Sequence, residues 1–282
     1  MTRTLALSSA LVLVLCACSS RQAQNPQTAA SAPAASAQSA ASGATQTSGA
    51  AEGASDQTAG GESDAAQNSG AAATGPMALP TSSQWQPGTS YTVVSPAQPT
   101  NAPPGKVQVM EVFWLACPHC HALEPYLLAW RKTKPDYVQF VRVPVMWGPV
   151  QQAHARLFYT LEALGRDDLV EKVFDTIHNL ETQTGSESIM VGSSSANTQQ
   201  MQEAFAAQNG VAATAFASAY NSFDVNTELQ QAQQVTQTYE IDSVPTIIVD
   251  GRYRTDVEKA GGENKLISLI DFLAKWDHDH LH

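Results

Sequence analysis

Two cysteines separated by two residues, in Cys117-Pro118-His119-Cys120, constrain the fold more than any other feature of the sequence. They follow an apolar run from Val107 to Ala116 that predicts a buried strand, and they precede apolar residues that recur at spacings of three and four, as in a helix. Pro118 suits the first helical position, because its missing N–H has no partner there. The sequence therefore predicts a strand, a tight turn and a helix that begins at the cysteines.

The two thiols lie where the N-terminus of a helix acts on them. Cys117 is placed among unpaired backbone N–H groups and at the positive end of the helix dipole, both of which stabilise a thiolate. His119 can add a positive charge or an N–H donor, which lowers the pKa of Cys117 further. We therefore expect Cys117 to be the exposed nucleophile and Cys120 to be the buried resolving thiol, since the helix turns the second cysteine inward.

Two other interpretations of the C-x-x-C pair stay open. The pair can be half of a zinc site that His119 and His121 complete, or it can be an inert buried pair. A zinc site is disfavoured because residues 119 and 121 of a helix point to different faces, and because the chain contains no second C-x-x-C pair. We therefore predict a redox-active dithiol with no metal and no cofactor.

The N-terminal third of the 282-residue chain is predicted not to fold. From Ser19 to about Thr81 it consists almost entirely of Ala, Ser, Gly, Gln, Thr, Asn and Pro, and such a segment cannot bury enough apolar surface to offset the entropy of ordering it. We expect a disordered tether over residues 18–84 and one folded domain over residues 85–282.

A net charge of -11 without a basic run argues against nucleic acid as a partner.

The first 17 residues are predicted to be a lipoprotein signal peptide. Arg3 supplies a short positive region, and the apolar stretch from Leu5 to Leu15 is too short to span a bilayer. Leu15-Cys16-Ala17-Cys18 resembles a bacterial lipobox, in which a small residue precedes the cysteine that takes the lipid. We therefore expect lipid on Cys18, with ordinary cleavage and no lipid as the alternative. The expected location is the periplasm, with the protein anchored to a bacterial membrane.

Export leaves few free thiols. Cys16 would leave with the signal peptide and Cys18 would carry the lipid, so only Cys117 and Cys120 remain in an oxidising compartment. A disulfide that closes so short a loop adds little stability through chain entropy. The function of this disulfide must therefore be chemical and not structural.

Along the domain, the patterns predict strands, then a helical block over about residues 150–240, then strands again. The expected strands span residues 106–115, 137–145, 246–249 and 252–254, the last two joined by the hairpin residues Asp250 and Gly251. The expected helices run from the cysteines to about residue 132 and over residues 153–164, 168–180, 201–207, 211–220, 227–239 and 263–276.

The histidines outside the C-x-x-C motif are not expected to bind a ligand. His121, His154 and His178 are predicted to be surface or core residues. The remaining three follow the last predicted helix: His278, His280 and His282. We expect them to lie in a solvated, unstructured tail, with weak metal binding by the three histidines as the alternative.

This order of elements resembles the thioredoxin fold with an inserted helical subdomain found in the DsbA family of periplasmic disulfide oxidases. The resemblance covers about residues 100–276 and is carried most specifically by Cys117-Pro118-His119-Cys120. Glu111 stands six residues before Cys117, where that family has a buried acid. Val244-Pro245 resembles the family's loop with a cis proline that faces the redox cysteines. An α/β fold of this type is therefore expected, preceded by the signal peptide and the tether.

The resemblance also implies which residues tune the redox pair. They are Pro118, His119, Glu111, Val244 and Pro245. In that family a lysine from the second strand often pairs with the buried acid, whereas here no clear equivalent is found and Arg142 is the nearest cation. Two alternatives stay open, namely Glu111 on the solvent-facing side of its strand and a trans bond before Pro245.

The function implied by the resemblance is that of a thiol:disulfide oxidoreductase, which donates the Cys117–Cys120 disulfide to exported proteins with free thiols. Its partners would be those proteins and a membrane-bound, quinone-linked reoxidant of the DsbB type, with the enzyme a monomer held at the membrane by its lipid. A disulfide isomerase or a reductase for cytochrome maturation would use the same fold, although isomerases of this type carry a separate folded dimerisation domain, which the tether cannot be. A non-enzymatic lipoprotein that only binds a partner is the third alternative.

Overall fold

The computed structural model describes residues 78–282 of the chain. The predicted signal peptide, Cys18 and most of the predicted tether lie outside these residues. Within residues 78–84, which the sequence assigns to the tether, Pro80 is buried and its carbonyl accepts a hydrogen bond from the hydroxyl of Tyr91. None of the helices between residues 78 and 282 is long and apolar enough to cross a membrane.

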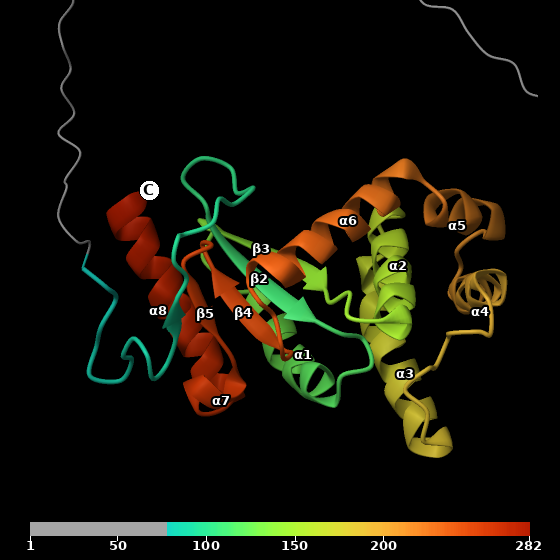
Figure 1. The fold of residues 1–282 in the computed structure, drawn as a ribbon, viewed down its shortest axis with the longest axis horizontal. Coiled ribbons are helices and arrows are strands. Elements are labelled where there is room, and N and C mark those ends of the chain that lie inside the picture. Colours follow the sequence, from blue (N-terminus) through green and yellow to red (C-terminus); the bar gives the residue numbers. More distant parts are fainter. Residues whose placement is uncertain (1–77) are drawn as a thin grey trace, which may run out of the picture. The chain divides into compact units, whose positions relative to one another are not determined.

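A five-stranded mixed sheet forms the centre of the domain (Figure 1). In spatial order, its strands are β1 (Thr92–Val93), β5 (Tyr253–Thr255), β4 (Thr246–Val249), β2 (Val107–Phe113) and β3 (Val138–Pro144). β2 runs parallel to β3 and antiparallel to β4, and all seven of its residues are buried. A continuous apolar run predicts such a strand, because both of its faces are covered.

Helices cover both faces of this sheet. α1 (Pro118–Arg131) and α8 (Glu263–Leu281) pack together against one face, close to the short helix α7 (Val257–Ala260). The C-terminal part of α6 (Phe223–Thr238) and the residues that follow it cover the other face. Because the side chains of a strand alternate between the two faces, β2 contributes to both of these apolar layers.

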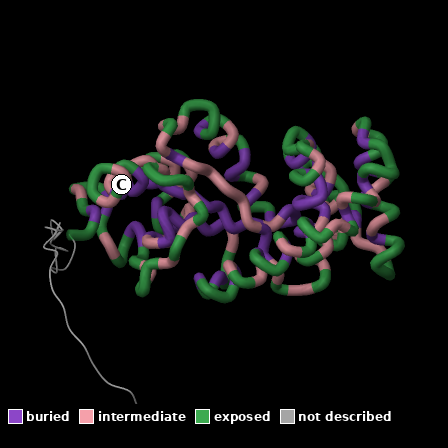
Figure 2. Tube along the Cα trace, turned by 90° about the horizontal axis from the view of Figure 1, so that it is seen from above, coloured by how far each residue is buried: buried purple, intermediate pink, exposed green. Residues whose placement is uncertain are grey.

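A helical insertion lies between β3 and β4, as the sequence predicts (Figure 1). It comprises α2 (Pro149–Ala163), a 3-10 turn (Asp167–Leu169), α3 (Val170–Thr184), α4 (Ser195–Gln208), α5 (Ala213–Tyr220) and α6. Its apolar core continues to the end of β2 and includes both Cys117 and Cys120. Figure 2 shows buried segments in the sheet and in the insertion alike. The cysteines therefore belong to the core that joins the two parts.

The predicted strands and helices are present, with ends that shift by a few residues. β4 has the predicted bounds, whereas α4 begins at Ser195 and not at residue 201. The sequence patterns missed β1, the 3-10 turn and α7. β1 has two residues, and its pairing with β5 joins distant parts of the chain, which local periodicity does not report.

The prediction of an unstructured histidine tail is wrong, because α8 continues to Leu281. The ring of His278 stacks on that of Tyr137, with centroids 4.0 Å apart, and His282 Nε2 lies 3.0 Å from Asp250 Oδ2. Both partners are distant in sequence, so the local composition of the tail could not indicate them.

The hairpin between β4 and β5 forms at Asp250 and Gly251, as predicted. Both residues have positive φ angles, 48° and 64°, and the N–H of Arg252 closes the turn on the carbonyl of Val249 (2.9 Å). A Cβ atom on Gly251 would lie 2.1 Å from the carbonyl oxygen of Gln98. Glycine is therefore required here both by the turn and by the close approach of the N-terminal segment.

Candidate active site

The turn between β2 and α1 presents the cysteines as the sequence predicts. Cys117 is the N-cap residue of α1, with an extended backbone, and Pro118 is the first residue of the helix. The backbone N–H of Cys117 donates to the carbonyl of Trp114 (3.0 Å), and that of His121 donates to the carbonyl of Cys117 (3.0 Å). One tight turn therefore carries the chain from the interior of the sheet to the start of the helix.

Both cysteines are free thiols, and both are buried. Cys120 has no exposed surface, as expected of a resolving thiol. Cys117 is only 5% exposed, so the expectation of an exposed nucleophile is wrong for this dithiol form. The cause is a distant loop, because the Cys117 thiol donates to the carbonyl of Val244 at 3.4 Å. The backbone carbonyl of Val244 therefore lies next to the Cys117 sulfur.

The two thiols differ in acidity. The Cys120 thiol, by hydrogen bonding to Cys117, makes the largest contribution to lowering the pKa of Cys117 to about 6, and the backbone N–H groups of Cys120 and His119 add to it. Burial opposes this shift, and the charge of His119 makes a smaller favourable contribution. Burial raises the pKa of Cys120 well above its usual range. Cys117 is therefore the thiol that carries the negative charge, and Cys120 keeps its proton and stabilises the Cys117 thiolate with it.

The loop that faces Cys117 contains a cis peptide bond between Val244 and Pro245, which confirms the predicted isomer. Thr246 follows as the first residue of β4, and its hydroxyl donates to the carbonyl of Ser243 (2.8 Å). The loop is therefore attached directly to a buried strand that pairs with β2. This pairing brings Val244 to the cysteines although 127 residues separate it from Cys117.

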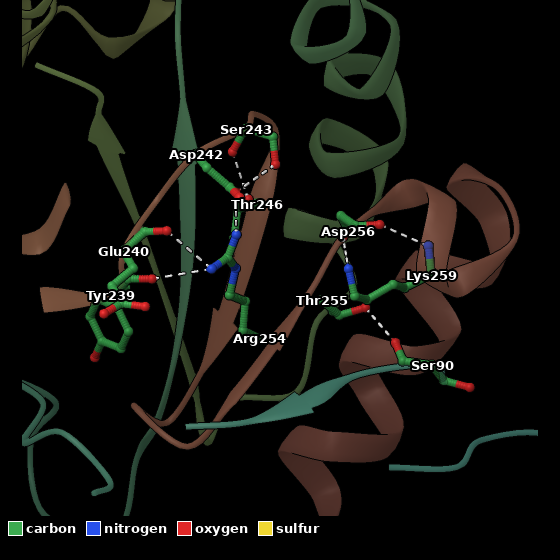
Figure 3. Close-up of polar contacts among 10 residues, drawn as sticks. All are labelled: Ser90, Tyr239, Glu240, Asp242, Ser243, Thr246, Arg254, Thr255, Asp256 and Lys259. Carbon is green, nitrogen blue, oxygen red and sulfur yellow. Dashed lines mark hydrogen bonds and ion pairs between the residues drawn. The ribbon is translucent and has the colours of Figure 1, made fainter. Parts of the chain in front are cut away.

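Arg254 in β5 contacts the segment that leads into this loop (Figure 3). Its guanidinium donates to the carbonyls of Tyr239 (3.3 Å) and Glu240 (3.2 Å) and pairs with Asp242. The hydroxyl of Ser243 donates to the same Asp242 carboxylate (3.1 Å). The segment before the cis proline is thus fixed by side chains that have no part in the redox chemistry.

Glu111 lies in β2 with no exposed surface, so the alternative of a solvent-facing acid is excluded. In the parallel pairing of β2 and β3 its direct neighbour is Arg142, whose Nε is 3.1 Å from Glu111 Oε2. A second carboxylate, Glu124 of α1, accepts a hydrogen bond from Nη2 of the same arginine. Two buried carboxylates therefore share one guanidinium beneath the cysteines.

Burial is the main influence on this acid, and it raises the pKa of Glu111. Arg142 acts in the opposite direction, and the nearby Glu124 adds to the increase. Among residues 78–282, no well-aligned hydrogen bond reaches either carboxylate oxygen of Glu111, and the guanidinium 3.1 Å away stabilises it mainly by its charge. The charge of Glu111 also contributes to raising the pKa of Cys120, which links the buried acid to the redox pair.

Sequence comparisons agree with this geometry. A thioredoxin family model matches residues 102–271. The thiol:disulfide interchange protein DsbA of Pseudomonas aeruginosa is 34% identical over 187 residues, which cover 66% of this chain and 82% of that protein. DsbA of Azotobacter vinelandii is 37% identical over 179 residues, covering 62% of this chain and 78% of that protein. This chain belongs to the DsbA family of thiol:disulfide oxidoreductases.

Solved structures of the family have the same fold. The crystal structure of Pseudomonas aeruginosa DsbA is 33% identical in sequence and aligns with a TM-score of 0.62 over 69% of this chain and 95% of that one. Reduced DsbA1 of Neisseria meningitidis is 25% identical and aligns with a TM-score of 0.58 over 70% of this chain and 97% of that one. The thioredoxin fold with a helical insertion, predicted from the sequence, is therefore confirmed.

The cation beneath the cysteines departs from the lysine that the DsbA family often uses. Arg142 of β3 stands at this place, and it lies over the rings of Phe113 (5.8 Å) and Phe140 (5.7 Å) as well as beside the two carboxylates. Sequence reasoning found Arg142 as the nearest cation but missed Glu124. That residue follows Cys120 by four positions, so it lies on the inward face of α1, and this spacing was the available signal.

The other predicted site residues lie at the surface or outside the described part of the chain. Pro118 and His119 are exposed at the start of α1, beside the buried cysteines. Cys18 belongs to the residues that the structure does not describe.

Proposed function

We propose that this oxidoreductase forms disulfides in exported proteins, with Cys117 as the nucleophile and Cys120 as the resolving thiol. The observation that carries the proposal is the opposite behaviour of the two thiols. Hydrogen bonding from Cys120 lowers the pKa of Cys117 to about 6, whereas burial keeps the proton on Cys120. A thiol of low pKa is a good leaving group, so a disulfide that contains it passes readily to a substrate.

The reaction consists of two thiol–disulfide exchanges. A substrate thiolate attacks the sulfur of Cys117 in the oxidised enzyme, the bond between Cys117 and Cys120 breaks, and Cys120 leaves with the electron pair and takes up a proton. A second thiolate of the substrate then attacks the substrate sulfur of the mixed disulfide and releases Cys117 as a thiolate. The substrate loses two electrons and gains a disulfide, and the enzyme is left as the dithiol.

The surrounding residues tune this exchange. His119 and the N-terminus of α1, which Pro118 begins, favour the Cys117 thiolate, and Glu111 favours the protonated form of Cys120. Val244 and Pro245 present a backbone carbonyl next to the Cys117 sulfur. A substrate chain that lies along this loop would be placed in line with the disulfide.

Oxidation of a reduced, unfolded protein tests the proposal directly. The oxidised enzyme should restore activity to reduced ribonuclease, and Cys117→Ser should abolish this effect because no disulfide can then form. Failure of the unaltered oxidised enzyme to restore ribonuclease activity would favour the partner-binding alternative. Faster action on scrambled ribonuclease or on insulin than on reduced ribonuclease would favour an isomerase or a reductase.

The N-terminal region completes the proposal. Residues 1–17 serve as the signal peptide, Cys18 carries the lipid, and the segment after it tethers a monomeric domain in the periplasm, where a membrane-bound, quinone-linked reoxidant of the DsbB type renews the disulfide. In support, the described chain begins at the end of the domain where α8 lies, far from the turn where β2 meets α1 (Figure 1). An attachment there is remote from the redox turn. Mass spectrometry of the mature N-terminus tests the lipid, and an N-terminus without a lipidated Cys18 would exclude the anchor.

A further inference from the structure

Trp114 connects the redox turn to the helical insertion. Its backbone carbonyl accepts the N–H of Cys117 (3.0 Å), which closes the turn that precedes α1. Its indole Nε1–H donates to Nδ1 of His154 in α2 (3.0 Å), and the two rings lie at 28° to each other. One residue therefore contacts the nucleophilic cysteine through its backbone and the insertion through its side chain.

The partners of His154 determine its tautomer. An indole N–H can only donate, so Nδ1 must be an acceptor, and the carbonyl of Ile189, 2.8 Å from Nε2, can only accept, so Nε2 must carry the proton. The side chain is 1% exposed, and burial lowers the pKa of His154 to about 4. The other titratable group that acts on it is His178 of α3, in the same direction, while the Ile189 carbonyl opposes both. His154 is therefore neutral at physiological pH.

The far end of this connection is itself fixed. Met190, which follows Ile189, is buried and has a positive φ of 61°, unusual for a residue with a side chain. The amide of the buried Gln202 in α4 donates to the carbonyl of Met190 (3.3 Å) and to that of Ala153 (3.0 Å), the residue before His154. The loop that anchors His154 is therefore tied back to α2.

We propose that His154 is a positioning residue for the redox turn: its neutral imidazole, anchored on Ile189, holds Trp114 so that the Trp114 carbonyl stays on the N–H of Cys117. His154 touches neither cysteine sulfur and no reacting atom. It acts by fixing the N-cap geometry that stabilises the Cys117 thiolate. The effect on disulfide exchange rests on the proposed function, whereas the tautomer and the hydrogen bonds do not.

Nitrogen NMR of the imidazole tests the first step on the unaltered full-length protein. We expect the shifts of a neutral ring with its proton on Nε2 between pH 5 and pH 8. A proton on Nδ1, or a titration midpoint near the ordinary histidine value of about 6.5, would overturn the proposal. This result does not depend on any exchange activity, so it also separates failure of the proposal from failure of the proposed function.

Three variants test the second step through the equilibrium constant with glutathione and the pKa of Cys117. His154→Leu removes both hydrogen bonds of the imidazole, and Trp114→Phe removes the indole N–H together with the part of the ring that carries it. Each should make the disulfide less oxidising by about threefold to tenfold, the range for one lost hydrogen bond, and raise the pKa of Cys117. His154→Gln, whose amide can accept from Trp114 and donate to Ile189, should stay close to the unaltered protein.

The double variant and a control decide between positioning and general loosening of the fold. Trp114→Phe combined with His154→Leu should shift the equilibrium no further than either change alone, because both break one connection. His280→Leu, which removes a histidine stacked on Trp276 in α8, should leave it unchanged. Additive effects in the double variant, or no shift in Trp114→Phe, would overturn the proposal, and Trp114→Phe decides the matter even if His154→Leu does not fold.

Discussion

Two carboxylates without exposed surface lie in different parts of this domain, and burial raises the pKa of both. Glu111 in β2 lies beside Arg142 and beneath the cysteines, and its charge acts on Cys120. Asp277, near the C-terminal end of α8, accepts a hydrogen bond from the hydroxyl of Tyr253 (3.0 Å), and no donor among the described residues reaches its second oxygen. Burial raises the pKa of Asp277 to about 6.

The comparison shows that a perturbed pKa does not by itself identify a functional acid. Asp277 is influenced by Tyr253, Asp250, Arg252 and His282, none of which touches a cysteine. Glu111 has the same kind of shift, but it belongs to a charged group that reaches the redox pair. The distinction therefore lies in what each acid is coupled to, and the two sites should respond differently to substitution.

The largest expected effect is the loss of the shared cation. Arg142→Met leaves Glu111 and Glu124 buried without a positive partner, which should lower the free energy of unfolding by about 3 to 5 kcal/mol in urea titrations at pH 7. Arg166→Met is the matched control, because Arg166 pairs with the exposed Asp168 and its loss should cost far less stability than the loss of Arg142. A loss below about 1 kcal/mol for Arg142→Met would show that the buried group does not depend on its cation.

Asp277→Asn should have a smaller effect of the opposite sign. The folded pKa of Asp277, about 6, lies above the unfolded value of about 3.9, so its stabilising contribution is complete below pH 4 and is lost as the pH rises through 6. Asparagine keeps the acceptor for Tyr253 without the charge, and we expect the variant to be about 2 kcal/mol more stable than the unaltered protein at pH 7.5. The two proteins should converge near pH 4, as measured by urea unfolding across this range.

Asp279→Asn provides the control for that measurement. Asp279 lies two residues further along α8, where it is exposed and pairs with Lys275. It should not reproduce the pH-dependent gain of Asp277→Asn. Equal behaviour of the two variants would mean that burial of Asp277 has no energetic consequence.

Much of the redox site could be predicted from the sequence because its main signals are local. The apolar run before Cys117 and Pro118 at the first helical position are both read within one segment, and Glu111 was expected through the resemblance to the DsbA family. Tertiary contacts determine the rest. Cys117 is buried because the carbonyl of Val244 covers it, and no local pattern reports that contact.

The partners of the two buried acids illustrate the same limit. Arg142 becomes the neighbour of Glu111 only through the register of β2 on β3. Asp277 was missed because the last helix was expected to end at residue 276, where the tail turns polar and acidic. The stacking of His278 on Tyr137 is a tertiary contact that stabilises α8 beyond residue 276. Register and long-range stacking are set by the folded chain as a whole.

Within the redox site, the donor on Cys120 should matter more than any other single group. Cys120→Ala removes the hydrogen-bond donor to the Cys117 thiolate and should raise the pKa of Cys117 by about one unit. Cys120→Ser keeps a donor at the same place and should raise it less. Rates of alkylation by iodoacetamide as a function of pH measure both. A lower pKa in the alanine variant than in the serine variant would contradict this assignment.

The smallest expected effect comes from His119. The histidine is exposed, and its charge is the least of the favourable contributions to the thiolate, so His119→Ser should raise the pKa of Cys117 by less than about half a unit. The equilibrium with glutathione should become less oxidising by less than about threefold. A shift larger than that of Cys120→Ala would reverse the order of influences inferred here.

A pH titration of thiolate absorbance in the reduced protein tests the central claim most directly. Because Cys120 retains its proton, we expect one thiolate, that of Cys117, to form with an apparent pKa of about 6, and no second thiolate below pH 9. The Cys117 thiolate should also stabilise the folded reduced protein, because its pKa is lower in the folded than in the unfolded chain. This stabilisation should be complete above the ordinary thiol pKa of about 8.5 and should be lost as the pH falls through 6. A single midpoint above pH 8, or two thiolates that form together, would contradict the account.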